Sequence, residues 1–374
     1  MDLEISFLEK ICNAFGPSGH EIEVTRIVKE YVNKFSDEVF NDKIGSLIFR
    51  LGSSGPKIML AGHIDEIGML VTGINKKGYL SFTQIGIWWD QSLLTQRVLV
   101  RTKKGDTHRG IICAPPPHIL NPETKKKVVT KDKMFIDIGC KSKKEVENFG
   151  VQIGDPIVPE SKFELIKRTQ IKKNDKGEET KQPVTLAVSK AFDDRIGLFC
   201  ITEMMKRLKA ENIPHPNRVY GVATVQEEVG RCGAKTAAEK IYPDVGFVLE
   251  ADIAGDVPGI SKLKVPSEMS KGISILAADA SMIPNPRLRH FVIDIAKELE
   301  INYQDSFVMG GATDAGPIHI TGTGCPSLVI GIPTRHIHSH NGILDLGDVE
   351  KAIRLLTEVI KRLDQRTIDS FTEI

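Results

Sequence analysis

An apolar strand that runs directly into two carboxylates constrains this sequence more than any other feature. Residues 219–225 are mostly apolar and β-branched without polar alternation, which is typical of a strand covered on both faces, as in a parallel sheet. The run stops at Gln226, Glu227 and Glu228, and Gly230 then indicates a turn. In open α/β sheets, ligands bind just beyond the carboxyl ends of the strands. Glu227 and Glu228 are therefore candidates for chemistry.

Helical and extended patterns alternate around this strand, and this alternation predicts a doubly wound α/β sheet. The expected helices are residues 196–208, 234–240, 288–299 and 349–363, and the expected strands are residues 44–50, 58–61, 219–225, 245–249 and 327–332. Near the N-terminus, Ser18 is followed three residues later by Glu21. This spacing is that of a capping box and predicts that a helix starts there.

Between residues 71 and 183 the pattern changes to short alternating segments with frequent Gly and Pro, which predicts a small all-β module. A chain of 374 residues exceeds the length at which one core usually stops growing, so two domains are expected. We predict a catalytic domain from residues 1–70 and 184–374, with a doubly wound mixed sheet and helices on both faces. An inserted small all-β domain, residues 71–183, interrupts it. Within the insert, residues 168–182 predict an exposed hairpin tip around the sequence NDKG at 174–177.

Charge and hydropathy exclude several kinds of partner. Residues 101–182 hold 19 Lys and Arg against 12 Asp and Glu, but these basic residues are dispersed and lack interleaved aromatics, which favours a solvated face over a nucleic-acid surface. The whole chain has a net charge of +1 and no apolar run near the roughly 20 residues that span a bilayer. Its N-terminus lacks the basic and apolar regions of a signal peptide. We therefore expect no nucleic-acid partner, no membrane partner and a cytoplasmic location.

The cysteines are scattered and form no Cys-x-x-Cys pair, which favours reduced thiols over disulfides or a structural zinc cage. They are Cys12, Cys113, Cys140, Cys200, Cys232 and Cys325. Cys232 lies near the Glu227–Glu228 pair but has no neighbouring base in the sequence. We therefore interpret it as a packing residue rather than a nucleophile.

Five apolar segments of the α/β portion run into groups that can bind a metal. They end in His63 and Asp65; Asp193 and Asp194; Glu227 and Glu228; Glu250 and Asp252; and His336, His338 and His340. Each has an ordinary explanation when taken alone. A lone His after a strand is commonly a hydrogen-bonded loop residue, and an Asp pair before Ile196 could cap a helix. Because a parallel sheet brings its strand ends to one edge, the five segments together predict a single site.

The types of donor in this set indicate the metal. Imidazoles and carboxylates without thiolates suit zinc, cobalt or manganese, and an excess of carboxylates suits two neighbouring cations. One cation needs three or four protein ligands, whereas two cations that share a bridging Asp need about five. The five segments can supply that number. We therefore predict two divalent metal ions per subunit.

Six motifs along the chain resemble the signature of a known enzyme family. They are AGHIDEIG at 61–68, KAFDDRIG at 190–197, VQEEVG at 225–230, LEADIAGDVPG at 249–259, GGATDAG at 310–316 and RHIHS at 335–339; the insert adds WDQSLLTQRV at 89–98 and PPPH at 115–118. In this order they are similar to the dinuclear metallo-aminopeptidase family of glutamyl aminopeptidase, the deblocking aminopeptidases and the tetrahedral (TET) aminopeptidases. The resemblance covers nearly the whole chain.

This resemblance implies a role for each motif residue. Asp193 would bridge the two metals, His63 and Glu250 would complete the shell of one, and Glu228 and His338 that of the other. Asp65 would orient the His63 ring, and Glu227 would be the general base. The residues alone leave His336 and His338 open, and the family pattern of His before Ser or Thr selects His338. Many relatives have Asp where this chain has Glu250, so Asp252 is the alternative ligand there.

The activity implied by the resemblance is metal-dependent removal of N-terminal residues from short peptides by a water that bridges the two metal ions. The alternatives are a related amidohydrolase or deacylase, a glycosidase that uses Glu227 and Glu228, and a metal- or peptide-binding scaffold without catalysis. The family likeness also implies that the insert mediates assembly into a homo-oligomer, from dimer to dodecamer.

Overall fold

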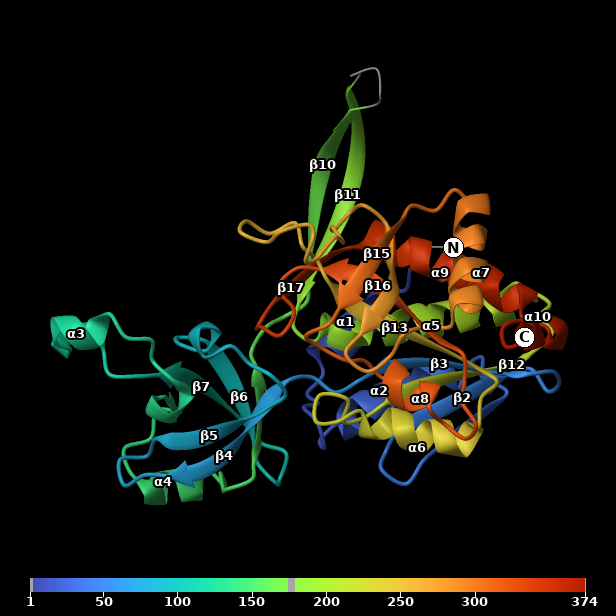
Figure 1. Ribbon diagram of the computed structural model, residues 1–374. Helices are drawn as coiled ribbons and strands as arrows, with labels where there is room; N and C mark the ends of the chain where they lie inside the picture. The colour runs from blue at the N-terminus through green and yellow to red at the C-terminus, as the bar shows by residue number, and fades with distance from the viewer. Residues whose placement is uncertain (1–2, 174–178, 374) are drawn as a thin grey trace.

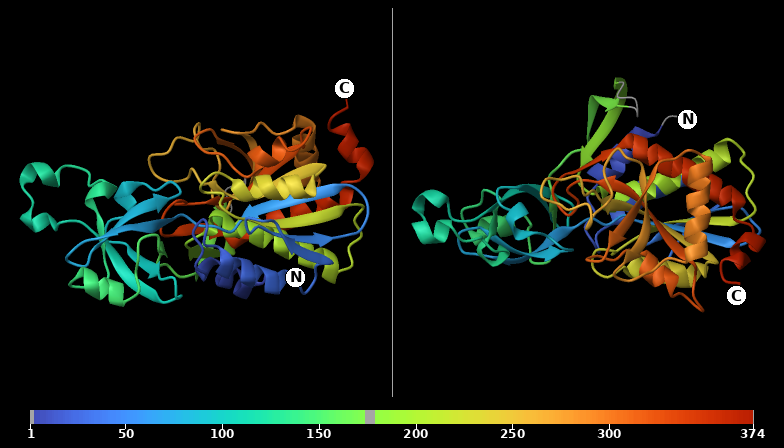
Figure 2. Two further views of the ribbon diagram at one scale, coloured as in Figure 1. Left: turned by 90° about the horizontal axis from the view of Figure 1, so that it is seen from below. Right: turned by 45° about the horizontal axis from the view of Figure 1, so that its top comes forward.

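The computed structural model describes residues 3–173 and 179–373 and shows three parts (Figure 1). A large sheet with helices forms the body, a small closed barrel projects from one side of it, and a long β-hairpin rises from its top. The two further views in Figure 2 show the same separation of barrel and body. Over the described residues, no helix combines the length and apolar character needed to cross a membrane.

The body contains an eight-stranded sheet in the order β1-β2-β12-β3-β13-β16-β14-β15. Its strands are β1 Glu38–Asn41, β2 Leu47–Leu51, β3 Lys57–His63, β12 Arg218–Thr224, β13 Val245–Ile253, β14 Ile273–Asp279, β15 Tyr303–Val308 and β16 Ser327–Thr334. The central strands β12, β3, β13 and β16 are parallel. Their neighbours β2 and β14 run antiparallel to them, so the sheet is mixed as predicted.

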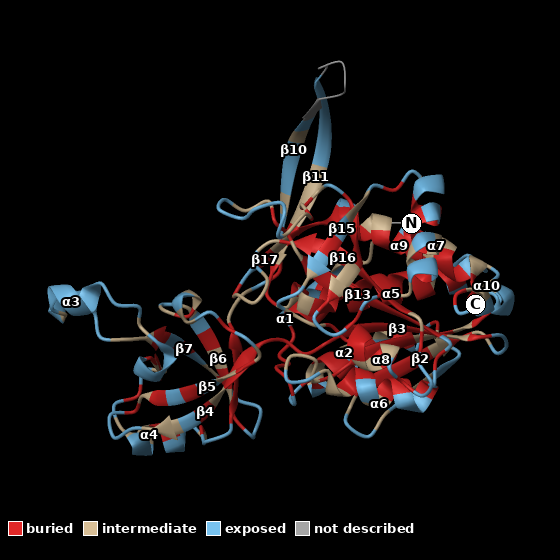
Figure 3. Ribbon diagram, in the orientation of Figure 1, coloured by how far each residue is buried: buried red, intermediate tan, exposed pale blue. Residues whose placement is uncertain are grey.

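Helices cover both faces of this sheet because its central strands are apolar on both faces. In β3, Ile58 and Leu60 pack into one core layer, whereas Met59 and Ala61 pack into the other. The first layer holds α1 Ile5–Asn13, α2 Ile22–Val32, α5 Phe192–Ala210, α7 Pro286–Glu298 and α9 Leu346–Arg362; the second holds α6 Cys232–Ile241 and α8 Ala315–His319. A short helix, α10 Gln365–Ser370, ends the described chain. Figure 3 shows the sheet buried between these layers.

The barrel closes in the strand order β4-β5-β8-β7-β6-β9 around a core of its own. Its strands are β4 Gly68–Ile74, β5 Leu80–Ile85, β6 Arg97–Arg101, β7 Thr107–Cys113, β8 Phe135–Asp137 and β9 Pro156–Pro159, with short helices α3 Pro122–Lys125 and α4 Lys143–Asn148. This is the small all-β module expected from the sequence. The domain boundaries at residues 71 and 183 stay a prediction.

The hairpin consists of β10 Glu164–Lys173 and β11 Glu179–Ser189, and its base pairs with β17 Gly342–Asp345 in a separate three-stranded sheet. The predicted hairpin is therefore present, and its outer part is exposed (Figure 3). The NDKG tip at 174–177 lies outside the described residues.

Two sequence predictions about single elements were wrong. The helix near Ser18 begins at Ile22 and has no capping box, because the Ser18 hydroxyl donates instead to Asp65 Oδ2 at 2.6 Å. The strand expected to stop at residue 249 continues to Ile253, so Glu250 lies inside β13 rather than after it. The structure also shows elements that were not predicted from the sequence: the strands β1, β14, β15 and β17 and the helices α1, α8 and α10.

A buried arginine joins the N-terminal segment to the start of α5. Arg195 is fully buried and its guanidinium donates to the carbonyls of Ile11, Ala14 and Ile64 at 2.7–3.0 Å. It also bonds Glu66 Oε1 at 3.1 Å. A buried charge is tolerated only when it is paired and its donors are satisfied, so these partners hold Arg195 in place.

Replacement of Arg195 by Met is therefore expected to lower the free energy of unfolding by about 3–5 kcal/mol, because Glu66 would keep Lys190 as its one charged partner and the buried carbonyls of Ile11 and Ile64 would lose the guanidinium. Urea unfolding with a chelator present measures the effect without a contribution from metal binding. Arg26→Met, at an exposed position on α2, is the matched control. A loss below about 1 kcal/mol for Arg195→Met would contradict this account.

Candidate metal centre

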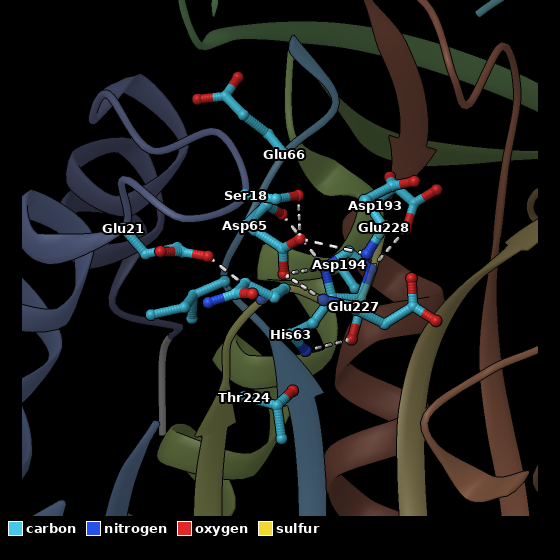
Figure 4. A network of polar contacts seen from close by, with 12 residues as sticks. Ser18, Glu21, His63, Asp65, Glu66, Asp193, Asp194, Thr224, Glu227 and Glu228 are labelled. Atoms are coloured by element: carbon cyan, nitrogen blue, oxygen red, sulfur yellow. Dashed lines mark hydrogen bonds and ion pairs between the residues drawn. The ribbon is translucent and has the colours of Figure 1, made fainter. Parts of the chain in front are cut away.

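The sequence-predicted residues meet at one edge of the eight-stranded sheet. His63 is the last residue of β3, Glu227 and Glu228 follow β12, and His338 follows β16. Parallel neighbours end at the same edge, which is why these distant residues converge; Figure 4 shows His63, Glu227 and Glu228 together. Asp193 reaches the same place from another direction, because it opens α5 after β11 of the three-stranded sheet.

The carboxylate of Asp193 stands between two imidazoles. Its Oδ1 lies 3.0 Å from His63 Nε2, and its Oδ2 lies 3.2 Å from His338 Nε2. Each ring turns its other nitrogen to a backbone carbonyl: His63 Nδ1 lies 3.1 Å from the oxygen of Asp65, and His338 Nδ1 lies 2.7 Å from that of Ile87. A carbonyl oxygen can only accept, so each Nδ1 donates to its carbonyl, and Nε2 is the nitrogen that faces Asp193 and is left to bind a cation once it is deprotonated.

Two further carboxylates complete two groups of donor atoms. Glu228 Oε1 lies 3.7 Å from His338 Nε2, and Glu250 Oε1 lies 3.9 Å from His63 Nε2. The donor atoms of His63, Asp193 and Glu228 all lie within 4.8 Å of one another, as do those of His63, Asp194 and Glu250. The two groups share His63, so they are neighbours.

Asp65 is completely buried and ties three parts of the centre together. Its Oδ1 accepts from the amide of Glu227 at 3.0 Å, and its Oδ2 accepts from the amide of Glu228 at 3.2 Å and from the Ser18 hydroxyl. Together with the contact of its own carbonyl to the His63 ring, these bonds fix the loop after β12 relative to β3.

The chain matches the M42 glutamyl aminopeptidase family over residues 45–355. It belongs to this family. The TET aminopeptidase from the marine sediment archaeon Thaumarchaeota archaeon SCGC AB-539-E09 is 51% identical, with 98% of each chain covered and a TM-score of 0.92. The lysyl aminopeptidase of Pyrococcus furiosus is 31% identical, with 95% of this chain and 96% of the relative covered. The TET1 peptidase of Pyrococcus horikoshii, which assembles into a tetrahedron or a large octahedral shell, is 30% identical, with 96% and 99% covered and a TM-score of 0.81.

Membership in the M42 family confirms the resemblance drawn from the motifs, and the geometry bears on the alternatives that the residues left open. His338 points into the centre, whereas His336 lines the adjoining pocket and has no contact with Asp193 among the described residues. Asp252 accepts from the Ser306 hydroxyl at 3.0 Å. Glu250, not Asp252, therefore stands nearest to His63.

The sequence singled out Asp194 only as the neighbour of Asp193 and gave it no role of its own. Asp194 is fully buried, and its carboxylate accepts from the amides of His63, Gly197 and Ala251 at 3.1 Å each. Through these three hydrogen bonds Asp194 links β3, α5 and β13 next to the metal centre. The three amides come from distant parts of the chain, so only the fold reveals this role.

The protonation of this M42 centre shows how strongly its charges are crowded. Burial raises the pKa of Glu227 and Glu250 well above the usual range, and burial followed by the charge of Asp193 raises the pKa of Glu228 to about 8. Burial opposes protonation of His338, but its bond to Asp193 and the nearby carboxylates outweigh this and raise its pKa to about 10. The carboxylates therefore need positive charge beside them to be ionised together.

The donor set of the M42 centre fits two divalent cations. Two Nε2 atoms face the two oxygens of one carboxylate, further carboxylates lie within ligand reach, and no thiolate is among these groups of donors. Six carboxylates gather around two imidazoles: Asp65, Asp193, Asp194, Glu227, Glu228 and Glu250. Two cations would offset this excess negative charge. A small pocket whose lining includes Lys190, Phe192 and His336 opens beside Asp193, Glu228 and His338.

Proposed function

We propose that this chain is a metal-dependent aminopeptidase that hydrolyses the N-terminal peptide bond of short peptides. The observation that carries the proposal is the placement of Asp193 between His63 Nε2 and His338 Nε2, at 3.0 and 3.2 Å, inside a cluster of carboxylates. Relatives that share at least 30% of its sequence over nearly its whole length are named aminopeptidases, which supports the same class of reaction here.

We assign Asp193 as the bridging ligand, His63 and Glu250 to one cation, and Glu228 and His338 to the other. The distances of Glu250 to His63 and of Glu228 to His338 support this division. Nitrogen and oxygen donors without sulfur favour Zn²⁺ or Co²⁺, with Mn²⁺ as the third possibility. When bound, the two cations supply Lewis acidity to the scissile carbonyl and activate a water between them.

The protein's part in the reaction then falls to Glu227 and Asp65. Glu227 would accept the proton of the attacking water and return it to the leaving amine, as a general base and then a general acid. Asp65 holds the Glu227 amide at 3.0 Å and thereby positions its side chain beside the cations. Because Asp65 is fully buried and bonds the backbone amides of Glu227 and Glu228, it would act through these residues as a positioning group.

The test uses the purified protein after chelation and re-addition of Zn²⁺ or Co²⁺, with a panel of aminoacyl anilides and their N-acetylated counterparts. We expect metal-dependent release of anilide from the free-amine substrates alone. Activity confined to the N-acetylated series would support a deacylase instead. Turnover of a cellulose substrate without any anilide release would point to a glycosidase, and both outcomes would reject the aminopeptidase assignment.

We also propose that the chain forms a homo-oligomer, between a dimer and a dodecamer, through the barrel. The TET relatives support assembly, and the barrel exposes large apolar side chains, including Ile119 at 75% and Val128 at 57%. Light scattering that detects only monomers would reject this.

We also propose a cytoplasmic location. All six cysteines are free, as is usual for proteins of reducing compartments.

A further inference from the structure

A short loop of the barrel, residues 86–89, reaches the metal centre of the body. This segment, here called the barrel loop, follows β5. Its Ile87 carbonyl accepts the Nδ1 proton of His338 at 2.7 Å. The ring of His63 is held in the same way, but by the carbonyl of Asp65, which follows it in the body. The two imidazoles are therefore oriented by different parts of the molecule.

At Gly86 the barrel loop also approaches Glu228, the carboxylate proposed to share a cation with His338. A Cβ atom at Gly86 would lie 2.9 Å from Glu228 Oε2 and 2.6 Å from Ile67 Cγ2. Its φ of +73° is also one that other residues rarely adopt. Glycine is therefore required for the barrel loop to approach Glu228 this closely.

Trp88 and His340 fasten the barrel loop to the segment that carries His338. The two rings meet edge to face with centroids 5.3 Å apart, and the Trp88 indole donates to the Gly68 carbonyl at 3.1 Å. His340 is only 4% exposed, and neither of its ring nitrogens has a hydrogen-bond partner among the described residues. Its ring therefore contributes packing rather than hydrogen bonds to this contact.

We propose that the barrel loop is a positioning element for the cation position formed by His338 and Glu228, a role separate from assembly. The Ile87 carbonyl fixes which nitrogen of His338 faces the cation, and Gly86 permits contact with Glu228. The packing of Trp88 on His340 holds the barrel loop against the segment that carries His338. The inference rests on the proposed function only in that these two residues bind a cation. Groups of this kind commonly change metal affinity by about 10- to 100-fold when they are altered.

The experiment is a calorimetric titration of the chelated full-length protein with Zn²⁺, with zinc content checked by elemental analysis. In Gly86→Ala we expect one of the two zinc sites to weaken by about 10- to 100-fold while the other keeps its affinity. Gly105→Ala is the matched control: it lies between β6 and β7 of the same barrel, has a φ of +93°, and a Cβ there would meet no atom within 4 Å. It should bind both ions as the parent does.

A second pair of variants guards against misfolding of Gly86→Ala, with circular dichroism as a check on all of them. His340→Ala removes the packing against Trp88 and should weaken the same single site, whereas His340→Phe keeps a ring there and should restore it. Unchanged affinities in Gly86→Ala and His340→Ala, or an equal loss at both sites, would overturn the inference while leaving the proposed function intact. A parent protein that binds no pair of zinc ions would reject both.

Discussion

Glu227→Gln is expected to lower kcat by about 10²- to 10⁴-fold while the protein keeps two metal ions per chain. The amide has nearly the size of the carboxylate but cannot accept a proton from water. The backbone of residue 227 donates to Asp65, and this bond does not depend on the side chain, so the loop should keep its position. Steady-state kinetics with an aminoacyl anilide give kcat, and elemental analysis of the same sample gives the metal content.

The control for this substitution is Glu239→Gln, which makes the same chemical change at an exposed position of α6. It should leave kcat within a factor of about two, because exposed changes far from the centre have small effects. If Glu227→Gln retained a tenth or more of the parent activity, the assignment of Glu227 as the base would be wrong. A loss of activity together with a loss of metal would assign Glu227 to the ligands instead.

Asp193→Ala should remove both metal ions and with them all metal-dependent activity. Its two oxygens face two different imidazoles, so one substitution takes a ligand from each cation position. His338→Ala should deplete only one of the two ions, because it faces only Oδ2 of Asp193. Since these side chains would be direct ligands, each loss of affinity should exceed the roughly 10- to 100-fold that removal of an outer partner costs.

His336→Ala is the matched control, because this histidine lies two residues from His338 and lines the pocket without facing Asp193. Metal analysis at limiting and at excess Zn²⁺ should therefore rank the variants in the order Asp193→Ala, His338→Ala, His336→Ala, from the largest loss to none. Retention of one full equivalent by Asp193→Ala would show that this carboxylate does not bridge. Equal losses in the two histidine variants would reject the choice of His338 over His336.

The sequence could predict the centre to the extent that its residues follow strands. His63 and Glu228 lie just beyond apolar runs, and the sheet needs no more than parallel pairing to bring such ends together. Glu250 was expected to follow a strand, but β13 continues past it to Ile253, and its role as a ligand stays a prediction. An apolar run does not show where a buried strand ends when polar side chains such as Glu250 and Asp252 are buried within the strand.

The rest depended on contacts between distant segments, which no local pattern encodes. The Ser18 hydroxyl fits a capping box by spacing, yet it bonds Asp65 because that buried carboxylate needs donors. The three amides that bind Asp194 and the Ile87 carbonyl beside His338 likewise come from remote positions. Main-chain groups have no sequence signature, so these contacts became visible only in the folded chain.

The strand order also sets the sequence of events as the chain leaves the ribosome. All six barrel strands lie within residues 68–159, so that unit can close while the second half of the protein is still being translated. Strand β3 precedes the barrel, but its neighbours are β12 and β13, the latter ending at Ile253. Almost two hundred residues after His63 must therefore be translated before both strands that pair with β3 are complete. His338 is translated only near the end of the chain, so the metal centre forms late.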